Sequence, residues 1–354
     1  MSMKEIAREL QGKVANLALR MPISWVNILA GPPVGVDGRT LDGRTQWFLK
    51  LLAHGGQPAV HTMSVADARE DFDAFMQLLG GKPAPVSSIL DRTLPGPAGP
   101  MRIRIYRPAD SVARLLPTIV YFHGGGWVIG SLEGYDLACR YFCARSGCAV
   151  VSVDYRLAPE HKFPAAVDDA VASYRWLAGE AVSLGLDHDR IVVAGDSAGG
   201  ALAAVVAQTV RHDPHPPCLQ WLIYPATDMA GDTASHKSCG EGFLLTQADM
   251  AWFRMHYLSP GAPEVDDPRA SPLRAPDLSG VAPALIFTAG FDPLRDEGQA
   301  YAVRLQAAGV KAIHREFETL IHGFIGMRGA VHAAARAMDD MVAGVRHELA
   351  QLGR

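Results

Sequence analysis

The sequence predicts an α/β fold built on a mostly parallel sheet, and three observations support this prediction. After Pro117 the chain alternates short apolar runs with helical stretches, as expected when buried parallel strands are joined by crossover helices. Residues 101–107 instead alternate apolar and polar side chains, which indicates a half-exposed antiparallel strand. With 354 residues, 49% of them hydrophobic, the chain is long and apolar enough for a large core.

The first segment is predicted to be an amphipathic helix. Ile6, Leu10, Leu17 and Met21 recur at helical spacing, and charged residues interrupt any run long enough for a signal sequence or a membrane span. Such a helix could touch a membrane surface or lie over an active site. The acidic residues on its polar face disfavour anionic lipid and therefore favour the second interpretation.

A second helix and an outer hairpin follow. Ser64 and Asp67 resemble a capping box, and a Gly-Gly pair at 80–81 closes the helix that they open. The strand at 101–107 is expected to pair with one near Ile89 across a Pro/Gly-rich turn. The tetrapeptide Asp-Gly-Arg-Thr occurs twice before this region, but it is too short to be a structural repeat.

The remaining elements alternate along the chain. The strands are expected at residues 118–122, 149–153, 191–194, 219–224, 284–289 and 314–317, and the helices at 165–177, 199–211, 295–308 and 331–352. Residues 227–272 break this rhythm with Gly, Asp and Pro around an aromatic helix that contains Trp252, Phe253 and Tyr257. This segment is therefore predicted to be an insertion over the strand ends.

Charge and cysteine content exclude several classes. The 33 basic and 37 acidic residues are mixed along the chain and give a net charge of −4, so nucleic acid is not an expected partner. Five cysteines are an odd number and none forms a CxxC pair, which favours reduced thiols in a cytoplasmic protein. Cys139 and Cys143 lie one helical turn apart but lack further ligands for a metal.

The segment Gly195-Asp196-Ser197-Ala198-Gly199 lies between a predicted strand and a predicted helix, which is the setting of a nucleophile elbow. Glycines two residues either side of the serine suit a strained turn that packs closely on its neighbours. The plainer alternative is a tight turn in which Ser197 caps a helix. The flanking strand and helix favour a nucleophile.

The glycine-rich segment His123-Gly124-Gly125-Gly126-Trp127 directly follows another apolar strand. Its N–H groups, together with that of Ala198, are predicted to form an oxyanion hole, where each donor contributes roughly 3 to 4 kcal/mol. A flexible turn or a phosphate loop is the alternative, but the GK[ST] ending of a phosphate loop is missing. His123 is expected to hold the loop and not to act as the base.

A serine nucleophile needs a base and a carboxylate that orients it. His322 follows the strand at 314–317, and Asp292 follows the strand at 284–289. Both are predicted at carboxyl strand ends, where ligands bind in open α/β sheets, and they complete the chain order Ser, Asp, His. Each taken singly could be a loop histidine or a helix cap.

From about Leu90 onwards the chain resembles the bacterial hormone-sensitive-lipase-like esterases whose elbow reads GDSAG. The resemblance rests on the glycine loop, the elbow and four further segments at residues 154–160, 224–225, 292–297 and 322–324. It implies an α/β-hydrolase fold with an eight-stranded, mostly parallel sheet and a helical cap. It also implies hydrolysis of short- and medium-chain esters, no cofactor or metal and, in many members, a homodimer. Stable membrane insertion is not expected, because charged residues interrupt the N-terminal apolar positions.

The resemblance assigns residues 1–82 to an N-terminal cap region and 83–354 to the catalytic domain, with a cap insertion at about 227–272. Residues 154–160 are implied to be structural, and Asp196 and Glu297 to support the reacting groups without touching substrate. The cap is the least well matched region. Aromatic and aliphatic side chains are candidate pocket walls or ordinary cap core, among them Trp127, Phe243, Leu244 and Trp252.

Three alternatives to a simple esterase remain open. The same machinery could act on amides, lactones or carbamates, because the sequence does not reveal the leaving group. A non-catalytic ligand receptor on this fold would be expected to lack the base, whereas His322 is present. An interfacial lipase would be expected to carry a more apolar lid.

Overall fold

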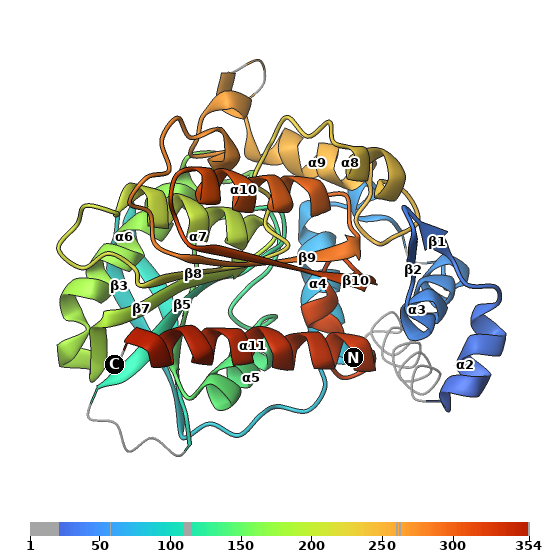
Figure 1. Ribbon diagram of the computed structural model, residues 1–354, viewed down its shortest axis with the longest axis horizontal. Helices are drawn as coiled ribbons and strands as arrows, with labels where there is room; N and C mark the ends of the chain where they lie inside the picture. Colours follow the sequence, from blue (N-terminus) through green and yellow to red (C-terminus); the bar gives the residue numbers. More distant parts are fainter. Residues whose placement is uncertain (1–20, 57, 110–114, 260, 262, 353–354) are drawn as a thin grey trace.

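An eight-stranded sheet runs through the centre of the computed structural model, which describes residues 21–56, 58–109, 115–259, 261 and 263–352 (Figure 1). Its strands lie in the order β10-β9-β8-β7-β5-β6-β4-β3. From β10 to β6 every neighbouring pair is parallel, and β4 joins β6 and β3 in antiparallel pairing. The predicted α/β-hydrolase fold with a mostly parallel sheet is confirmed.

The strand bounds follow the predicted apolar runs, extended at several ends. They are β3 Ser88–Gly96, β4 Gly99–Arg107, β5 Leu116–Phe122, β6 Ala149–Val153, β7 Leu186–Asp196, β8 Leu219–Ile223, β9 Ala284–Phe291 and β10 Ala312–Ile321. Every residue of β6, β8 and β9 is buried, as expected for strands covered on both faces. The predicted hairpin is formed by β3 and β4.

Helices cover both faces of the sheet. One face carries α6 Ala165–Glu180, α7 Ala198–Thr209 and α10 Arg295–Ala307, and the other carries α5 Asp136–Ser146 and α11 His332–Leu352 (Figure 1). Two buried apolar clusters lie between these layers. The helix α5 was not predicted; it carries Cys139 and Cys143, both buried and free.

The N-terminal region contains α2 Ile23–Ala30, α3 Gly43–His54, the 3-10 turn η1 Val60–Thr62 and α4 Val65–Leu79. As predicted, Ser64 caps α4: its side chain accepts from the Asp67 amide, and Gly80 ends the helix. The predicted first helix, with Ile6, Leu10 and Leu17, lies outside the described residues.

The repeated Asp-Gly-Arg-Thr tetrapeptide has a structural role that the sequence reading missed. Asp37 and Gly38, with φ of 52° and 78°, form the turn between β1 Gly35–Val36 and β2 Arg39–Thr40. In the second copy the Asp42 side chain accepts from the Thr45 amide and caps α3. The same four letters therefore make a hairpin turn once and a helix start once.

The segment that interrupts the alternation carries α8 Ala234–Cys239, α9 Gln247–Tyr257 and the 3-10 turns η3 Pro263–Asp266 and η4 Pro272–Arg274. The helices α8 and α9 lie beside the β1–β2 hairpin, above the end of the sheet (Figure 1). Among the helices of the described residues, none combines the length and apolar character that crossing a membrane requires.

Candidate active site

Ser197 is the single residue between β7, which ends at Asp196, and α7, which begins at Ala198. Its backbone has φ 52° and ψ −119°, a conformation that costs about 1–3 kcal/mol and persists only when the surroundings impose it. A Cβ on either flanking glycine would collide with backbone: at Gly195 with Phe122 and at Gly199 with His123. The strained, tightly packed turn expected of a nucleophile elbow is present.

Three side chains from separate strand ends meet at this turn. His322 Nε2 lies 3.0 Å from Ser197 Oγ, and His322 Nδ1 lies 2.8 Å from Asp292 Oδ2. Asp292 is fully buried and its second oxygen accepts the Leu294 amide at 2.8 Å. The ring of Tyr224 lies 4.6 Å from the imidazole. The structure thus brings together the serine, base and carboxylate that the sequence analysis selected.

The N–H of Gly124 already has acceptors within the protein, so the predicted oxyanion hole has fewer donors than expected. It donates to Asp196 Oδ1 at 2.9 Å and to the Tyr135 hydroxyl at 3.0 Å. An amide with two buried acceptors is not free to bind an oxyanion. Including Gly124 among the donors was therefore wrong: its residue type allowed the role, but the buried carboxylate next to the elbow uses its N–H.

Gly125, Gly126 and Ala198 remain as candidate donors. Gly125 and Gly126 have φ of 112° and 57°, and the hydrogen bonds of the described residues leave both N–H groups without a protein acceptor. Ala198 is the first residue of α7, so its N–H has no intrahelical partner. A Cβ at Gly126 would collide with the ring of Phe253 in α9. The glycine loop is therefore in direct contact with the insertion.

Asp196 holds the glycine loop through hydrogen bonds to both of its carboxylate oxygens. Its Oδ1 accepts from the Tyr121 hydroxyl at 2.8 Å as well as from Gly124, and its Oδ2 accepts from the hydroxyls of Tyr135 at 3.0 Å and Tyr224 at 3.4 Å. Burial raises the pKa of this carboxyl, against the effect of the surrounding donors. Asp196 therefore connects the Gly124 amide to three buried tyrosine hydroxyls.

His123 is buried and stacks on Tyr155 with 4.3 Å between ring centroids. Burial lowers its pKa to about 4, so the ring is neutral at neutral pH and Nδ1 donates to the Gly124 carbonyl at 2.8 Å. Tyr155 also donates to the His123 carbonyl at 2.7 Å, and the Ala158 amide donates to the Trp127 carbonyl at 2.9 Å. The segment that contains Tyr155 and Ala158 therefore supports the glycine loop.

Glu297 is fully buried below the start of the insertion. Its Oε1 accepts the amides of Thr227 at 2.6 Å and Asp228 at 3.1 Å. Oε2 has no hydrogen-bond partner in the described part of the chain and lies 3.6 Å from His236 Nε2. Burial raises the pKa of Glu297 and lowers that of His236, so it works against an ion pair between the two side chains despite their short distance.

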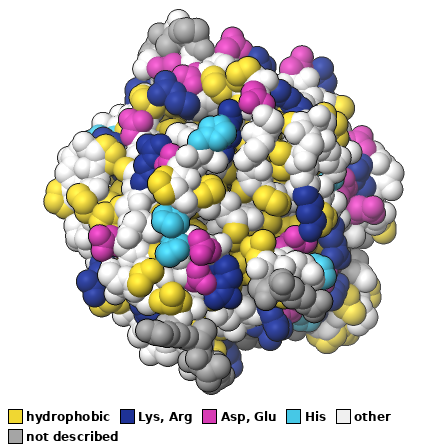
Figure 2. Space-filling model, turned by 60° about the vertical axis from the view of Figure 1, so that its left-hand side comes forward, with side chains coloured by type: hydrophobic (Ala, Val, Ile, Leu, Met, Phe, Trp, Pro, Cys, Tyr) yellow, Lys and Arg dark blue, Asp and Glu magenta, His cyan; other side chains and the backbone are white. Residues whose placement is uncertain are grey.

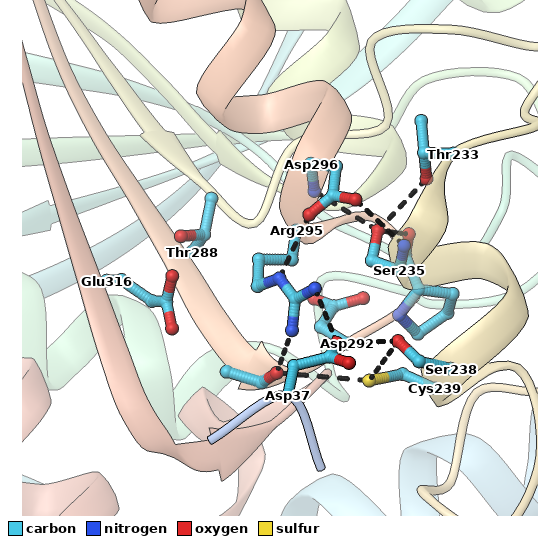
Figure 3. Close-up of polar contacts among 12 residues, drawn as sticks. Asp37, Thr233, Ser235, Ser238, Cys239, Thr288, Asp292, Arg295, Asp296 and Glu316 are labelled. Carbon is cyan, nitrogen blue, oxygen red and sulfur yellow. Dashed lines mark hydrogen bonds and ion pairs between the residues drawn. The ribbon is translucent and has the colours of Figure 1, made fainter. Parts of the chain in front are cut away.

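An arginine network next to the triad was missed by the sequence analysis (Figure 3). Arg295 is 5% exposed and donates to the Gly290 carbonyl at 2.8 Å, to Asp296 at 3.0 Å and to Asp37 at 2.9 Å. Asp37 also accepts from the Ser238 hydroxyl of α8 at 2.7 Å. The carboxylate of Asp37 thus joins the hairpin tip to the insertion and to the start of α10, which follows the loop that carries Asp292. The Asp-Gly turn signal could have identified the hairpin.

Two further contacts hold the hairpin on the sheet. Arg39 forms a two-pronged ion pair with Glu316 of β10, with Nη2 and Oε2 2.9 Å apart. The Asp42 amide donates to the Thr319 carbonyl at 2.9 Å. The N-terminal region is therefore attached to the edge strand whose end carries the triad histidine.

The candidate pocket residues divide into two groups. Trp127 stacks on Tyr257 at 4.5 Å and, like Trp252, is buried in the apolar core below the insertion. Phe243 is buried against Phe291. Leu244 lies next to the residue after His322, since a Cβ there would be 3.7 Å from its side chain. Among the four candidates, Leu244 is thus next to the loop that carries His322, and Phe253, which was not a candidate, contacts the glycine loop.

Comparison with known proteins supports this geometry. The model of a protein family described as alpha/beta hydrolase fold matches residues 119–326, which contain the glycine loop, the elbow and both partners of the serine. The matched residues make up more than half of the chain.

Individual relatives match over nearly their whole length. The carboxylic ester hydrolase LipN of Mycobacterium tuberculosis is 40% identical over 98% of this chain and 94% of its own. The esterase LipI of the same organism is 40% identical over 80% of this chain and 90% of its own. A solved ester hydrolase from the Lake Arreo metagenome, complexed with a phosphonate derivative, has a TM-score of 0.84 and 42% identity, and the match covers 89% of this chain and 100% of that one.

Proposed function

The chain belongs to the hormone-sensitive-lipase-like family of α/β-hydrolases and is a carboxylic ester hydrolase, and on that premise we propose that Ser197, Asp292 and His322 hydrolyse short- to medium-chain esters through an acyl-enzyme. The observation that carries this assignment is the continuous chain of hydrogen bonds from Ser197 Oγ through the imidazole to Asp292.

In the first step Ser197 Oγ attacks the ester carbonyl and His322 Nε2 accepts the hydroxyl proton. Asp292 keeps the proton of the imidazole on Nδ1, so that Nε2 is the free base, and it stabilises the imidazolium that forms. The 3.0 Å and 2.8 Å separations are within the range that proton transfer and tautomer control require.

The negative oxygen of the tetrahedral intermediate is bound by the amides of Gly125, Gly126 and Ala198. The dipole of α7 adds to this stabilisation, because Ala198 begins the helix. His322 then donates its proton to the leaving alcohol. A water molecule, deprotonated by the same imidazole, attacks the acyl-enzyme and frees Ser197.

We propose that the cap consists of residues 1–82 and about 227–272, and that residues 83–354 otherwise form the catalytic domain. Two contacts between these separate stretches support the division. His61 Nδ1 lies 2.8 Å from Asp249 Oδ1 at the start of α9, and Asp37 accepts from Ser238 of α8. The contact of Phe253 with the glycine loop supports a cap that bounds the acyl site.

The experiment is hydrolysis of a graded series of aryl esters by the full chain and by Ser197→Ala. The proposal expects kcat/KM to be highest with short and medium acyl chains, and turnover to be lost in Ser197→Ala while the circular dichroism spectrum stays unchanged. Matched amides and lactones belong in the same series. A higher kcat/KM for either would replace the ester assignment with the corresponding hydrolase.

A further inference from the structure

We propose that His188, Asp189 and His215 form a binding site for one divalent metal ion of the zinc type, remote from the esterase site. His188 Nε2 lies 3.4 Å from Asp189 Oδ1, and His215 Nδ1 lies 3.9 Å from the same oxygen. One ligand atom from each residue lies within 4.8 Å of the other two. Two imidazole nitrogens and a carboxylate are a common zinc ligand set.

Two of the three distances are close to those that a metal between the three atoms requires, and the third, between the two histidine nitrogens, is within 4.8 Å. Zinc binds histidine nitrogen and carboxylate oxygen at about 2.0–2.2 Å, which places two ligands of a tetrahedral ion about 3.3–3.6 Å apart. The 3.4 Å pair fits this range, and the 3.9 Å pair needs a shift of a few tenths of an ångström. The fourth position would be filled by water, because Asp189 is exposed and both histidines are half-buried.

The backbone presents His188 and Asp189 outside the regular sheet. In the pairing of β7 with β5, Leu186 faces Leu116 and Ile191 faces Thr118, so residues 187–190 bulge out of the ladder. The Asp187 carboxylate holds this bulge, since it accepts the Asp189 amide at 3.0 Å and the Arg190 side chain at 2.7 Å. The bulge therefore fixes the backbone of two ligands, and the neighbouring Arg190 is already paired with Asp187.

His215 is held by the stiff connection between α7 and β8. It stands between Pro214 and Pro216, whose φ angles are restricted by their rings, and its carbonyl accepts from the Tyr174 hydroxyl at 2.8 Å. The two histidine rings lie with centroids 4.3 Å apart. Little conformational freedom of this ligand would be lost on binding, which favours affinity.

The site lies at the end of β7 opposite to the nucleophile, since the strand runs from Leu186 to Asp196 and Ser197 follows. About 20 Å or more of strand separates the two. Figure 2 shows the α6 and β7 side of the molecule, where histidine side chains reach the surface among acidic and basic ones. The bound ion would therefore join the bulge of β7 to the α7–β8 connection and stabilise the fold, without taking part in ester hydrolysis.

The test is a calorimetric zinc titration of the full chain and of His188→Ala and His215→Ala, with His212→Ala as matched control. His212 is a surface histidine three residues before His215 and bonds to Arg211. We expect both test variants to lose one equivalent of bound zinc, or to bind it at least about tenfold more weakly, and the control to bind as the unmodified chain does. In parallel, zinc should raise the melting temperature of the unmodified chain and the control only.

Esterase activity provides an independent readout. With zinc absent, His188→Ala and His215→Ala should turn over an aryl ester as the unmodified chain does, so a failed titration cannot be confused with failure of the esterase assignment. The proposal is overturned if the test variants and the control bind the same number of zinc ions with the same affinity. It is also overturned if the unmodified chain shows no saturable binding.

Discussion

Asp37, at the tip of the N-terminal hairpin, and Arg295, at the start of α10, form an ion pair with 2.9 Å between Oδ2 and Nη2. The hydrogen bond from Ser238 and the one from Arg295 hold the pKa of Asp37 below its usual value. Since Arg295 also binds the carbonyl of Gly290, this pair connects the cap to the segment that places Asp292 (Figure 3).

Asp37→Ala should therefore lower both stability and activity. It leaves Arg295 with two of its three partners, and we expect a loss of about 1 kcal/mol, because Asp37 is 38% exposed and solvent screens part of the interaction. The free energy of unfolding in urea and kcat/KM measure the two effects. The control is Asp232→Ala, which breaks a solvent-exposed ion pair with Lys237 within the 227–272 insertion. If the two variants behave alike, the hairpin does not position the loop that carries Asp292.

Tyr135→Phe should reduce kcat with little change in KM. The substitution removes a donor to Asp196 and an acceptor of the Gly124 amide, so the glycine loop loses part of its support. A buried acceptor left with one long bond costs about 1–3 kcal/mol, and 1.4 kcal/mol in the barrier is tenfold in rate. Tyr141→Phe is the matched control, since its hydroxyl bonds to Asp339 on α11. Equal kcat values in the two variants would contradict the loop's dependence on Asp196.

Gly126→Ala should impair catalysis beyond the cost of its backbone conformation. An alanine at position 126 would have to adopt the strained φ near 57°. Its Cβ would also collide with Phe253, so the loop and α9 would have to separate. Gly147→Ala has a comparable φ of 75° and open space around the new Cβ. Both variants should lose about 1 kcal/mol of stability from the backbone conformation, and Gly126→Ala should lose more because of the collision. Only Gly126→Ala should lose kcat/KM. Steady-state kinetics of the pair would reveal whether this contact matters, and unchanged kinetics in Gly126→Ala would show that it does not.

Glu297→Gln should remove a pH dependence of stability. Because burial raises the pKa of Glu297 above 4.5, the folded chain holds this proton to a higher pH than the unfolded chain. Stability is therefore lost as pH rises from 4.5 through the folded pKa, by about 1.4 kcal/mol per pH unit for one proton. Unfolding free energies from pH 4.5 to 7 should fall for the unmodified chain relative to Glu297→Gln. Glu318 is exposed, so Glu318→Gln gives the pH dependence expected from losing a carboxylate on the surface. The same slope in all three proteins would exclude the buried proton.

The chemistry could be read from the sequence because it depends on local patterns. The elbow needs a strand, a strained turn and a helix in direct succession. Each of these has a recognisable residue pattern around Ser197: an apolar run, two glycines and a helical stretch. The partners Asp292 and His322 follow apolar strands, and parallel strands end at one edge. Their meeting therefore follows from the topology alone.

The contacts between distant segments could not be read in the same way. Whether the Gly124 amide is free depends on Asp196, a buried carboxylate far away in the chain, and residue type does not encode that choice. Asp37, the partner of Arg295, lies in a hairpin whose strands have two residues each, too short to show an alternating pattern. The packing of the glycine loop against the insertion also decides the positions of two aromatic side chains. Phe253 contacts the loop, whereas Trp127 is buried in the core.

Mass spectrometry of the chain after reaction with a serine-directed organophosphate is the most direct test of the central assignment. One covalent adduct is expected, on the peptide that contains Ser197, and its formation should slow sharply in His322→Ala while the fold is retained. An adduct on another serine, or ester turnover by Ser197→Ala close to that of the unmodified chain, would contradict the account.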